Sequence, residues 1–361
     1  MTRVLMTADA VGGVWTYAID LARALAPHGV QVALATMGRL PTPAQSAEAS
    51  AVPGLTLYPS AFALEWMPNP WDDIARAGDW LLSLEAEWQP DIVHLNGYAH
   101  GGLPWNAPVL MTGHSCVLSW WQAVHGSAAP SEWQRYHDEV QAGLQAADLV
   151  AAPTQAMLDC LQVHYGPLGP TCVLPNGRNA ALFRPAKKQP FVFCAGRLWD
   201  DAKNIRTLAE IAPTLPWPVC VAGETALPGD QAQEFPGVQL LGCLPPLEVA
   251  SRLAEAAIYA LPALYEPFGL SALEAGLSGC ALVLGDIPSL REVWGDAALY
   301  AAPNNPDILR DAVLRLISDT SLRQKMSARA LARARTYTLE RMAEGYLYAY
   351  QTLLGETSAC A

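Results

Sequence analysis

Two glutamates in the segment YEPFGLSALEAGL, Glu266 and Glu274, are the first side chains that suggest chemistry. Glu266 precedes Pro267, and a residue before proline is biased away from the helical conformation. Glu274 falls in the first turns of the helix expected to follow. Carboxylates are strong acceptors for the two hydroxyls of a diol, so the pair predicts a site for sugar hydroxyls. The alternative is that Glu274 only complements the helix dipole.

Two other segments contain groups suited to binding a phosphate. Phe268, Gly269 and Leu270 stand at the expected helix start, where free backbone amides favour an anion or a hydroxyl. Arg197 and Lys203 share the loop GRLWDDAKN, which follows the apolar run FVFCAG, and the chain has only four lysines. Together they could neutralise a diphosphate. The alternative is a surface pair balanced by the two neighbouring aspartates.

Gly12 and Gly13 separate the first apolar run from the first helical one. Glycines here let backbone amides approach a ligand at a helix start, although a plain tight turn would use them equally well. The pair does not extend to G-x-G-x-x-G, and no acidic residue is placed to bind a dinucleotide ribose. A nicotinamide dehydrogenase is therefore disfavoured.

The elements that must position these residues alternate between short apolar runs and longer amphipathic ones. This alternation predicts an α/β protein with doubly wound parallel sheets in two Rossmann-like domains that face across a cleft. We expect residues 1–185 to form the first domain and residues 186–340 the second, with a linker over 184–190. A last helix, about 341–361, is expected to pack back on the first domain. Ligands of such sheets bind at the carboxyl ends of the strands.

Composition excludes several classes of partner. The 361 residues carry a formal net charge of −12, and residues 1–185 hold 15 acidic residues, seven arginines and no lysine. This disfavours nucleic acid and anionic lipid as partners. Eight cysteines without a C-x-x-C pair predict reduced, buried thiols and no metal site. No apolar run is long enough for a membrane helix or a signal peptide, so we expect a cytoplasmic protein without stable membrane association.

Three segments taken together carry a family resemblance: GRLWDDAK, EPFGLSALEAGLSGCALV and CVLPNGRNAALFRP, with the strand ends DIVH and TGHS in support. They resemble the retaining glycosyltransferases of the GT-B fold, in the large family 4 group, over nearly the whole chain. One departure is Glu224, which stands in the loop VAGETALPG where the family often has a second glycine.

The resemblance implies a metal-independent hexosyltransferase that uses a nucleotide diphosphate sugar and no cofactor. Arg197 and Lys203 would stabilise the leaving diphosphate, Glu266 would contact the hexose, and His114 would lie near its 6-hydroxyl and the reacting centre. Glu274 would bind the ribose. The remaining donor contacts implied are Gly13, Gly196, Phe268, Gly269, Leu270 and Leu244, the last in a loop with Gly242 and Cys243 that holds the base. The anomeric bond would break with oxocarbenium character and configuration would be retained.

The acceptor is expected to be uncharged, a saccharide or a small polar aglycone. Nine of the 12 tryptophans lie at or before position 133, and indole faces stack well on sugars or aromatic rings. We expect Trp15, Trp120, Trp121 and His94 to contact it. UDP-glucose and GDP-mannose both fit as donors, with UDP-glucose favoured. Two alternatives remain open: a binding protein that does not turn the nucleotide sugar over, and a nucleotide-sugar epimerase.

Overall fold

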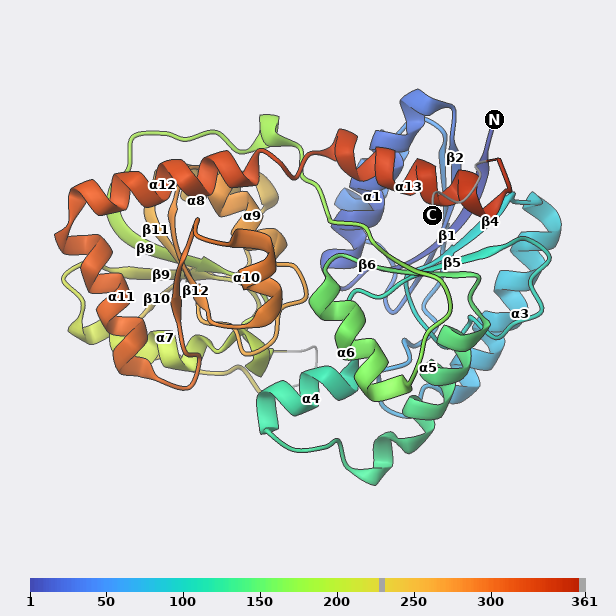
Figure 1. Cartoon of the computed structure of the whole chain (residues 1–361), viewed down its shortest axis with the longest axis horizontal. Coiled ribbons are helices and arrows are strands. Elements are labelled where there is room, and N and C mark those ends of the chain that lie inside the picture. The colour runs from blue at the N-terminus through green and yellow to red at the C-terminus, as the bar shows by residue number, and fades with distance from the viewer. Residues whose placement is uncertain (227–230, 357–361) are drawn as a thin grey trace. The chain divides into compact units, whose positions relative to one another are not determined.

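The computed structural model describes residues 1–226 and 231–356 and divides into two compact units. The first comprises Met1–Trp121, Ala128–Gly177 and Leu339–Ala361, and the second comprises Gln122–Ser127 and Arg178–Thr338. The main crossings thus lie at 177/178 and 338/339, where the sequence placed them at 185/186 and 340/341. Figure 1 shows the course of the chain.

The first unit is built on a parallel sheet of seven strands in the order β3-β2-β1-β4-β5-β6-β7. Its strands are β1 (Arg3–Asp9), β2 (Gln31–Met37), β3 (Leu55–Pro59), β4 (Ile92–Leu95), β5 (Val109–Thr112), β6 (Leu149–Ala152) and β7 (Thr171–Val173). Its helices are α1 (Gly13–Leu25), α2 (Pro43–Ser50), α3 (Trp71–Trp88), α5 (Gln134–Ala146), α6 (Gln155–Tyr165) and α13 (Leu339–Leu353). Helix α4 (Val117–His125) begins in this unit and ends in the second.

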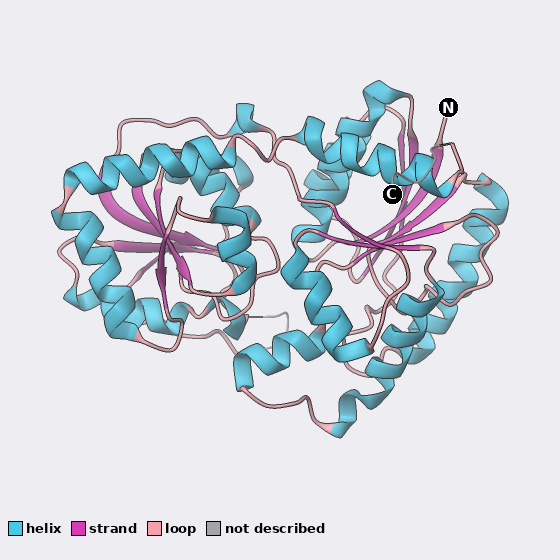
Figure 2. Cartoon of the chain, viewed as in Figure 1, coloured by secondary structure: helices cyan, strands magenta, loops and turns pink. Residues whose placement is uncertain are grey.

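Both faces of this sheet are covered, as Figure 2 shows. Val4 and Met6 of β1 pack in one cluster with α1 and α13, whereas Leu5 between them packs with Leu81 of α3 on the other face. Successive side chains of a strand point to opposite faces, so a strand buried on both sides reads as a continuous apolar run. The last helix, α13, belongs to the first unit and lies against α1 (Figure 1). Residues 357–361 of the expected span lie outside the described residues.

The second unit has a parallel sheet of six strands in the order β10-β9-β8-β11-β12-β13. The strands are β8 (Gln189–Ala195), β9 (Val219–Ala222), β10 (Gln239–Leu240), β11 (Ala256–Leu261), β12 (Ala281–Gly285) and β13 (Leu299–Ala301). The helices are α7 (Ile205–Ile211), α8 (Pro246–Glu255), α9 (Leu270–Leu277), α10 (Pro288–Trp294), α11 (Pro306–Ser318) and α12 (Thr320–Ala334). One apolar cluster with Phe193, Tyr259 and Trp294 fills this unit.

Each sheet reverses its strand order at one place, between β1 and β4 in the first unit and between β8 and β11 in the second. Chain connections leave such a switch point in opposite directions, which opens a crevice at the carboxyl ends of the two strands. The loops after β1, β4, β8 and β11 are therefore where side chains for ligands should gather.

Two further expectations can be compared with the structure. Among the described residues, no helix combines the length and the apolar character that crossing a bilayer requires. The seven described cysteines are free, and Cys116, Cys194, Cys220 and Cys280 are buried as expected. Cys243 is exposed, contrary to the expectation of a core thiol, because its loop carries it past the end of the short edge strand β10.

Candidate active site

Glycines join three strand-end loops of the second unit at close range. Gly223 after β9 lies so near Gly196 after β8 that a Cβ on Gly223 would fall 1.7 Å from the Gly196 carbonyl oxygen. The Gly223 amide in turn donates to the Gly242 carbonyl at 2.8 Å. Only glycine leaves room for this approach, so the layer of loops over β8, β9 and β10 is built on backbone contacts.

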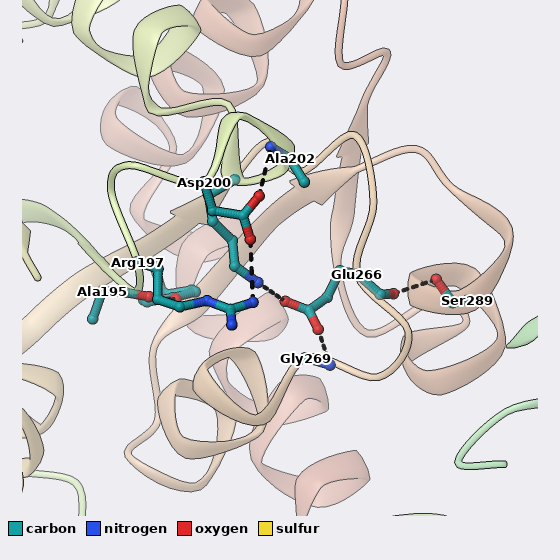
Figure 3. Close-up of polar contacts among 9 residues, drawn as sticks. Ala195, Arg197, Asp200, Ala202, Glu266, Gly269 and Ser289 are labelled. Carbon is teal, nitrogen blue, oxygen red and sulfur yellow. Dashed lines mark hydrogen bonds and ion pairs between the residues drawn. The ribbon is translucent and has the colours of Figure 1, made fainter. Parts of the chain in front are cut away.

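Arg197 projects from the loop after β8 and is partly exposed (Figure 3). Its Nη2 lies 3.2 Å from Oδ2 of Asp200, whose Oδ1 accepts from the Ala202 amide at 3.1 Å. Asp200 thereby begins the short 3₁₀ helix Asp201–Lys203 and is itself buried. Asp200 therefore both shapes the loop and pairs with Arg197. The alternative reading, in which neighbouring aspartates balance the two cations, thus holds for Arg197, whereas Lys203 has a different partner.

Lys203 makes the contact that ties the loop after β8 to the start of α9. Its Nζ lies 2.6 Å from Oε2 of Glu266, and Oε1 of the same carboxylate accepts from the Gly269 amide at 3.0 Å. Only 15% of the Lys203 side chain and 13% of the Glu266 side chain are exposed. Gly269 is the N-cap of α9 and has φ of +90°, a conformation that favours glycine. Figure 3 shows Glu266 between Gly269 and Ser289, whose Oγ donates to the Glu266 carbonyl at 2.5 Å.

The position of Lys203 is fixed by the residue that follows it. Asn204 has φ of +56°, in the left-handed region that asparagine tolerates better than most residues. Its Nδ2 donates to the carbonyls of Pro262 and Pro303, at 3.0 and 2.9 Å. The loop after β8 is thus fastened to the ends of β11 and β13.

Glu274 is held by an arginine that the sequence analysis did not single out. Nη2 of Arg178 lies 2.8 Å from Oε1 of Glu274, and the two side chains are 10% and 15% exposed. Arg178 belongs to the segment CVLPNGRNAALFRP that carried part of the family resemblance. Its guanidinium also lies 5.2 Å from the ring of Phe183. The expected diol-binding carboxylate is therefore preorganised by an ion pair.

The other expected donor contacts belong to the same unit but serve partly as core. The Phe268 side chain is buried against Tyr337, so its expected contribution is the backbone amide alone. Leu270 and Leu244 are partly buried against the unit's apolar cluster. Leu270 is the first residue of α9 and Leu244 follows the turn at Gly242. The structure thus brings Arg197, Lys203, Glu266 and the α9 start to the switch point between β8 and β11.

In the first unit, the amides of the glycine turn are already engaged. Oδ1 of Asp9, the last residue of β1, accepts from the amides of Val11 and Gly12, each at 2.9 Å. Gly13 is the first residue of α1 and is exposed. A ligand could therefore be met here by the amides of the first turn of α1 rather than by the turn itself.

His114 follows β5, and Asn96 and Tyr17 position its ring. Its Nε2 lies 2.7 Å from Oδ1 of Asn96, and the Tyr17 ring packs edge-on at 4.4 Å. Asn96 Nδ2 donates to the Thr7 carbonyl at 2.7 Å, which fixes the amide so that Oδ1 accepts from His114. Desolvation lowers the pKa of His114 to about 3, so the imidazole is neutral near pH 7 and its other nitrogen is an acceptor.

Two of the expected acceptor contacts lie in the core instead. His94 is fully buried, with Nδ1 2.8 Å from the Tyr350 hydroxyl and Nε2 2.9 Å from Oγ1 of Thr112. Trp15 is 4% exposed and its indole nitrogen donates to Oε2 of Glu48 at 2.9 Å. Both point inward because α1 and β4 are covered by α13 and α2. Trp120 and Trp121 of α4 are half-buried and pack ring to ring at 6.2 Å.

Both units match known protein families. A family model described as Glycosyltransferase Family 4 matches residues 11–182, and one described as Glycosyl transferases group 1 matches residues 179–333. The chain is 31% identical to O-antigen chain mannosyltransferase B of Escherichia coli over 167 residues, which are 43% of this chain and only 44% of that protein. It is 25% identical to the D-inositol 3-phosphate glycosyltransferase of Nocardia farcinica over 97% of this chain and 86% of that one.

The solved structure of sucrose-phosphate synthase (tll1590) from Thermosynechococcus elongatus has the same fold. It superposes with a TM-score of 0.84 over 99% of this chain and 100% of the other, at 19% identity. The two family models adjoin near the boundary between the units, so each unit carries one of them. The chain therefore belongs to the family 4 type of glycosyltransferases with the GT-B fold.

Proposed function

We propose that this protein is a retaining glycosyltransferase that moves a hexose from a nucleotide diphosphate sugar to an uncharged hydroxyl acceptor, with UDP-glucose as the first donor to test. The observation that carries the proposal is the chain of contacts Lys203–Glu266–Gly269. It links a cation, a carboxylate and the start of α9 at the switch point of the second sheet.

The three groups have complementary uses toward such a donor. The Lys203 ammonium and the Gly269 amide are suited to the diphosphate, and Glu266 is suited to the hydroxyls of the hexose. In the structure, Glu266 accepts from both of these donors. Entry of a diphosphate would replace the carboxylate on Lys203 and Gly269 and would leave Glu266 able to accept from the sugar.

The balance of charges supports a mechanism in which the diphosphate replaces carboxylates as the partner of the cations, rather than one in which it enters a preformed site of unpaired positive charge. Arg178, Arg197 and Lys203 each pair with a carboxylate, namely Glu274, Asp200 and Glu266. The formal charge of these six groups sums to zero. As the anomeric bond breaks, negative charge grows on the leaving diphosphate, and Lys203 and Arg197 would stabilise that charge.

We propose that His114 acts as a neutral hydrogen-bond acceptor. Because its pKa lies far below neutral, it can accept a hydrogen bond from a hydroxyl of the hexose without adding positive charge beside an oxocarbenium-like centre. The acceptor would be deprotonated by the leaving phosphate in a front-face reaction. Of the expected acceptor contacts, Trp120 and Trp121 stay in this proposal.

The test is a panel of UDP-glucose, GDP-mannose and ADP-glucose. A ligand at a hundred times its dissociation constant stabilises the native state by about 2.7 kcal/mol, so a true donor raises the melting temperature. Donor turnover should persist in EDTA, since Lys203, Arg197 and α9 are proposed to do the work of a metal ion. NMR should show the product with the anomeric configuration of the donor.

Three results would contradict the proposal. They are the absence of stabilisation by every nucleotide sugar, inversion of the anomeric centre, and conversion of the donor sugar to its epimer without an acceptor. Stabilisation without turnover with any acceptor would instead favour a binding protein.

A further inference from the structure

A cavity of about 60 Å³ lies within the first unit at the carboxyl ends of β1, β2 and β4. Asp9, Glu65, Trp66, Asn96 and His100 are among its lining residues. It lies at the point where the strand order of this sheet reverses, the usual place for a ligand in such a sheet. A cavity of this size has room for several water molecules, which is enough for one hydroxylated edge of a ring.

The carboxylate of Glu65 lines the cavity and is held by backbone amides. Its Oε2 accepts from the amides of Tyr98 and Ala99, at 3.0 and 2.7 Å, and Oε1 also lies 3.2 Å from the Tyr98 nitrogen. These contacts fix its orientation from the loop after β4. Burial raises the pKa of Glu65 to about 7 in spite of the backbone donors, which lower it. A carboxyl group that titrates near neutral pH in a cavity is typical of a binding site.

Asn96 joins this cavity to the residue expected at the reacting centre. The Asn96 side chain lines the cavity, and its Oδ1 lies 2.7 Å from Nε2 of His114. Trp66 supplies an aromatic surface to the same space, which suits the apolar face of a sugar or polyol. A hydroxyl held here would therefore be within the neighbourhood of His114.

The charges around the cavity define what it can take. Two carboxylates, Asp9 and Glu65, line it, and among its lining residues there is no lysine or arginine. Arg39 and Arg76 come from neighbouring segments and are not among the lining residues. Nε of Arg39 donates to the Ala10 carbonyl at 3.0 Å, and Arg76 pairs with Asp73. A phosphate in this space would face like charges with no lysine or arginine among the lining residues to offset them.

We propose that this cavity is an acceptor subsite for the hydroxyl-rich edge of an uncharged sugar or polyol, and that it rejects phosphorylated acceptors. The inference rests on the proposed function and adds where the uncharged acceptor binds and which residues select it against a phosphorylated one. Glu65 accepts hydrogen bonds from the hydroxyls. Asp9 repels an anion, and Glu65 adds to that repulsion to the extent that its carboxyl group is ionised.

Binding can be tested without any donor in the sample. The protein is labelled with ¹⁵N-tryptophan, and the indole signal of Trp66 is assigned with the Trp66→Phe variant. The probes are three pairs: glucose and glucose 6-phosphate, mannose and mannose 6-phosphate, and myo-inositol and D-inositol 3-phosphate. We expect at least one uncharged compound to shift the Trp66 signal and to bind about tenfold or more tightly than its phosphate, about 1.4 kcal/mol.

Two substitutions identify the cause of the discrimination. Glu65→Gln keeps the size of the side chain and should bring the members of a pair closer in affinity, and Glu65→Lys should reverse their order. The matched control is Glu85→Gln. Glu85 likewise accepts from two loop amides, those of Asn106 and Ala107 at 2.8 and 3.0 Å, but these amides lie before the start of β5, at the amino end of the strand rather than at the carboxyl end.

The proposal is overturned if no uncharged compound shifts the Trp66 signal, if a phosphate binds as tightly as its partner, or if Glu85→Gln changes the ratio as much as Glu65→Gln does. Should the Glu65 variants fail to fold, the ratios in the unaltered protein decide. The donor panel is measured on separate samples, so failure of nucleotide binding and failure of this subsite are distinguished.

Discussion

Lys203 is the side chain on which the candidate site depends most. It is one of four lysines, it is largely buried, and its partner is a carboxylate that also accepts from the amide of Gly269, the N-cap of α9. Such an ion pair contributes little net stability in many proteins, because desolvation offsets the attraction. Its retention at a strand end is better explained by a ligand that exchanges with the carboxylate.

We expect Lys203→Met to lower the turnover number by about a hundredfold to a thousandfold, the usual cost of losing one group that stabilises charge in the transition state. Methionine keeps much of the apolar stem, and Glu266 keeps the Gly269 amide, so the fold should persist. Steady-state kinetics and circular dichroism check both points. The control is Lys325→Met, an exposed lysine of α12. Near-normal turnover in Lys203→Met would remove the lysine from the mechanism.

Local pattern was enough to predict Arg197, Lys203, Glu266 and Glu274 as a group, and the structure places the first three at one switch point. It was not enough for Arg178, because its partner Glu274 is distant in the sequence and no periodicity signals a long-range ion pair. The same limit applies to Glu65. The burial of His94 and Trp15 was also missed, since a strand-end histidine or a helix-start indole gives no sign of which neighbour covers it.

Among the elements, the buried strands were the most predictable. Strands such as β1, β4 and β11 stand out in the sequence, because a strand covered on both faces reads as an unbroken apolar run. Strand β3 gives a weaker signal: its residues LTLYP are half-exposed at the edge of the first sheet and end in proline. An edge strand is buried on fewer sides, so its pattern is weaker and a proline there is tolerated.

Helix ends in the second unit depend on a lysine that the sequence placed in a linker. Nζ of Lys188 donates to the carbonyls of Ser278 and Leu253, at 2.7 and 3.1 Å, near the carboxyl ends of α9 and α8. Carbonyls at helix ends have no partner within the helix, and a cation is favoured beside them. Burial lowers the pKa of Lys188. In the folded protein the two carbonyl oxygens take the place of water as hydrogen-bond partners of this amine.

We expect Lys188→Met to reduce the free energy of unfolding by about 1–3 kcal/mol, the cost of leaving buried polar groups without a partner. Lys187→Met is the matched control: Lys187 is exposed, so this variant should stay within about 0.5 kcal/mol of the parent protein. Urea denaturation followed by tryptophan fluorescence measures the difference. Equal stability of the two variants would show that Lys188 does not hold these helix ends.

On the scale of the whole molecule, the first unit is assembled from both ends of the chain. Helix α13 adds Tyr346 and Tyr350 to a core that begins with β1. His94 of β4 meets both: its ring stacks on Tyr346 at 5.2 Å and its Nδ1 lies 2.8 Å from the Tyr350 hydroxyl. Arg178 and Thr338, which bound the main segment of the second unit, form a parallel bridge. The segment that leaves the first unit and the segment that returns to it are therefore joined by a backbone bridge at this one pair of residues.

This assembly makes the first unit sensitive to acid. Desolvation, followed by the nearby His114, lowers the pKa of His94 to about 3, whereas an unfolded histidine titrates near 6.5. Below pH 6.5 the unfolded chain therefore binds a proton that the native His94 does not, and stability falls as the pH falls toward 3. Between pH 7 and pH 5 this linkage amounts to about 2 kcal/mol for one such histidine.

We expect His94→Gln to be less stable than the parent protein at pH 7 but to lose less stability on acidification to pH 5. Hydrogen exchange followed by mass spectrometry separates the two units. The flatter pH response should appear in peptides from β1, β4 and α13 and be absent from peptides of β8 and β11, whose cores contain no histidine among the buried residues described. An unchanged pH response in α13 peptides would mean that His94 is not what couples this helix to the sheet. In that case the apolar contacts of α13 with α1 would have to account for its docking alone.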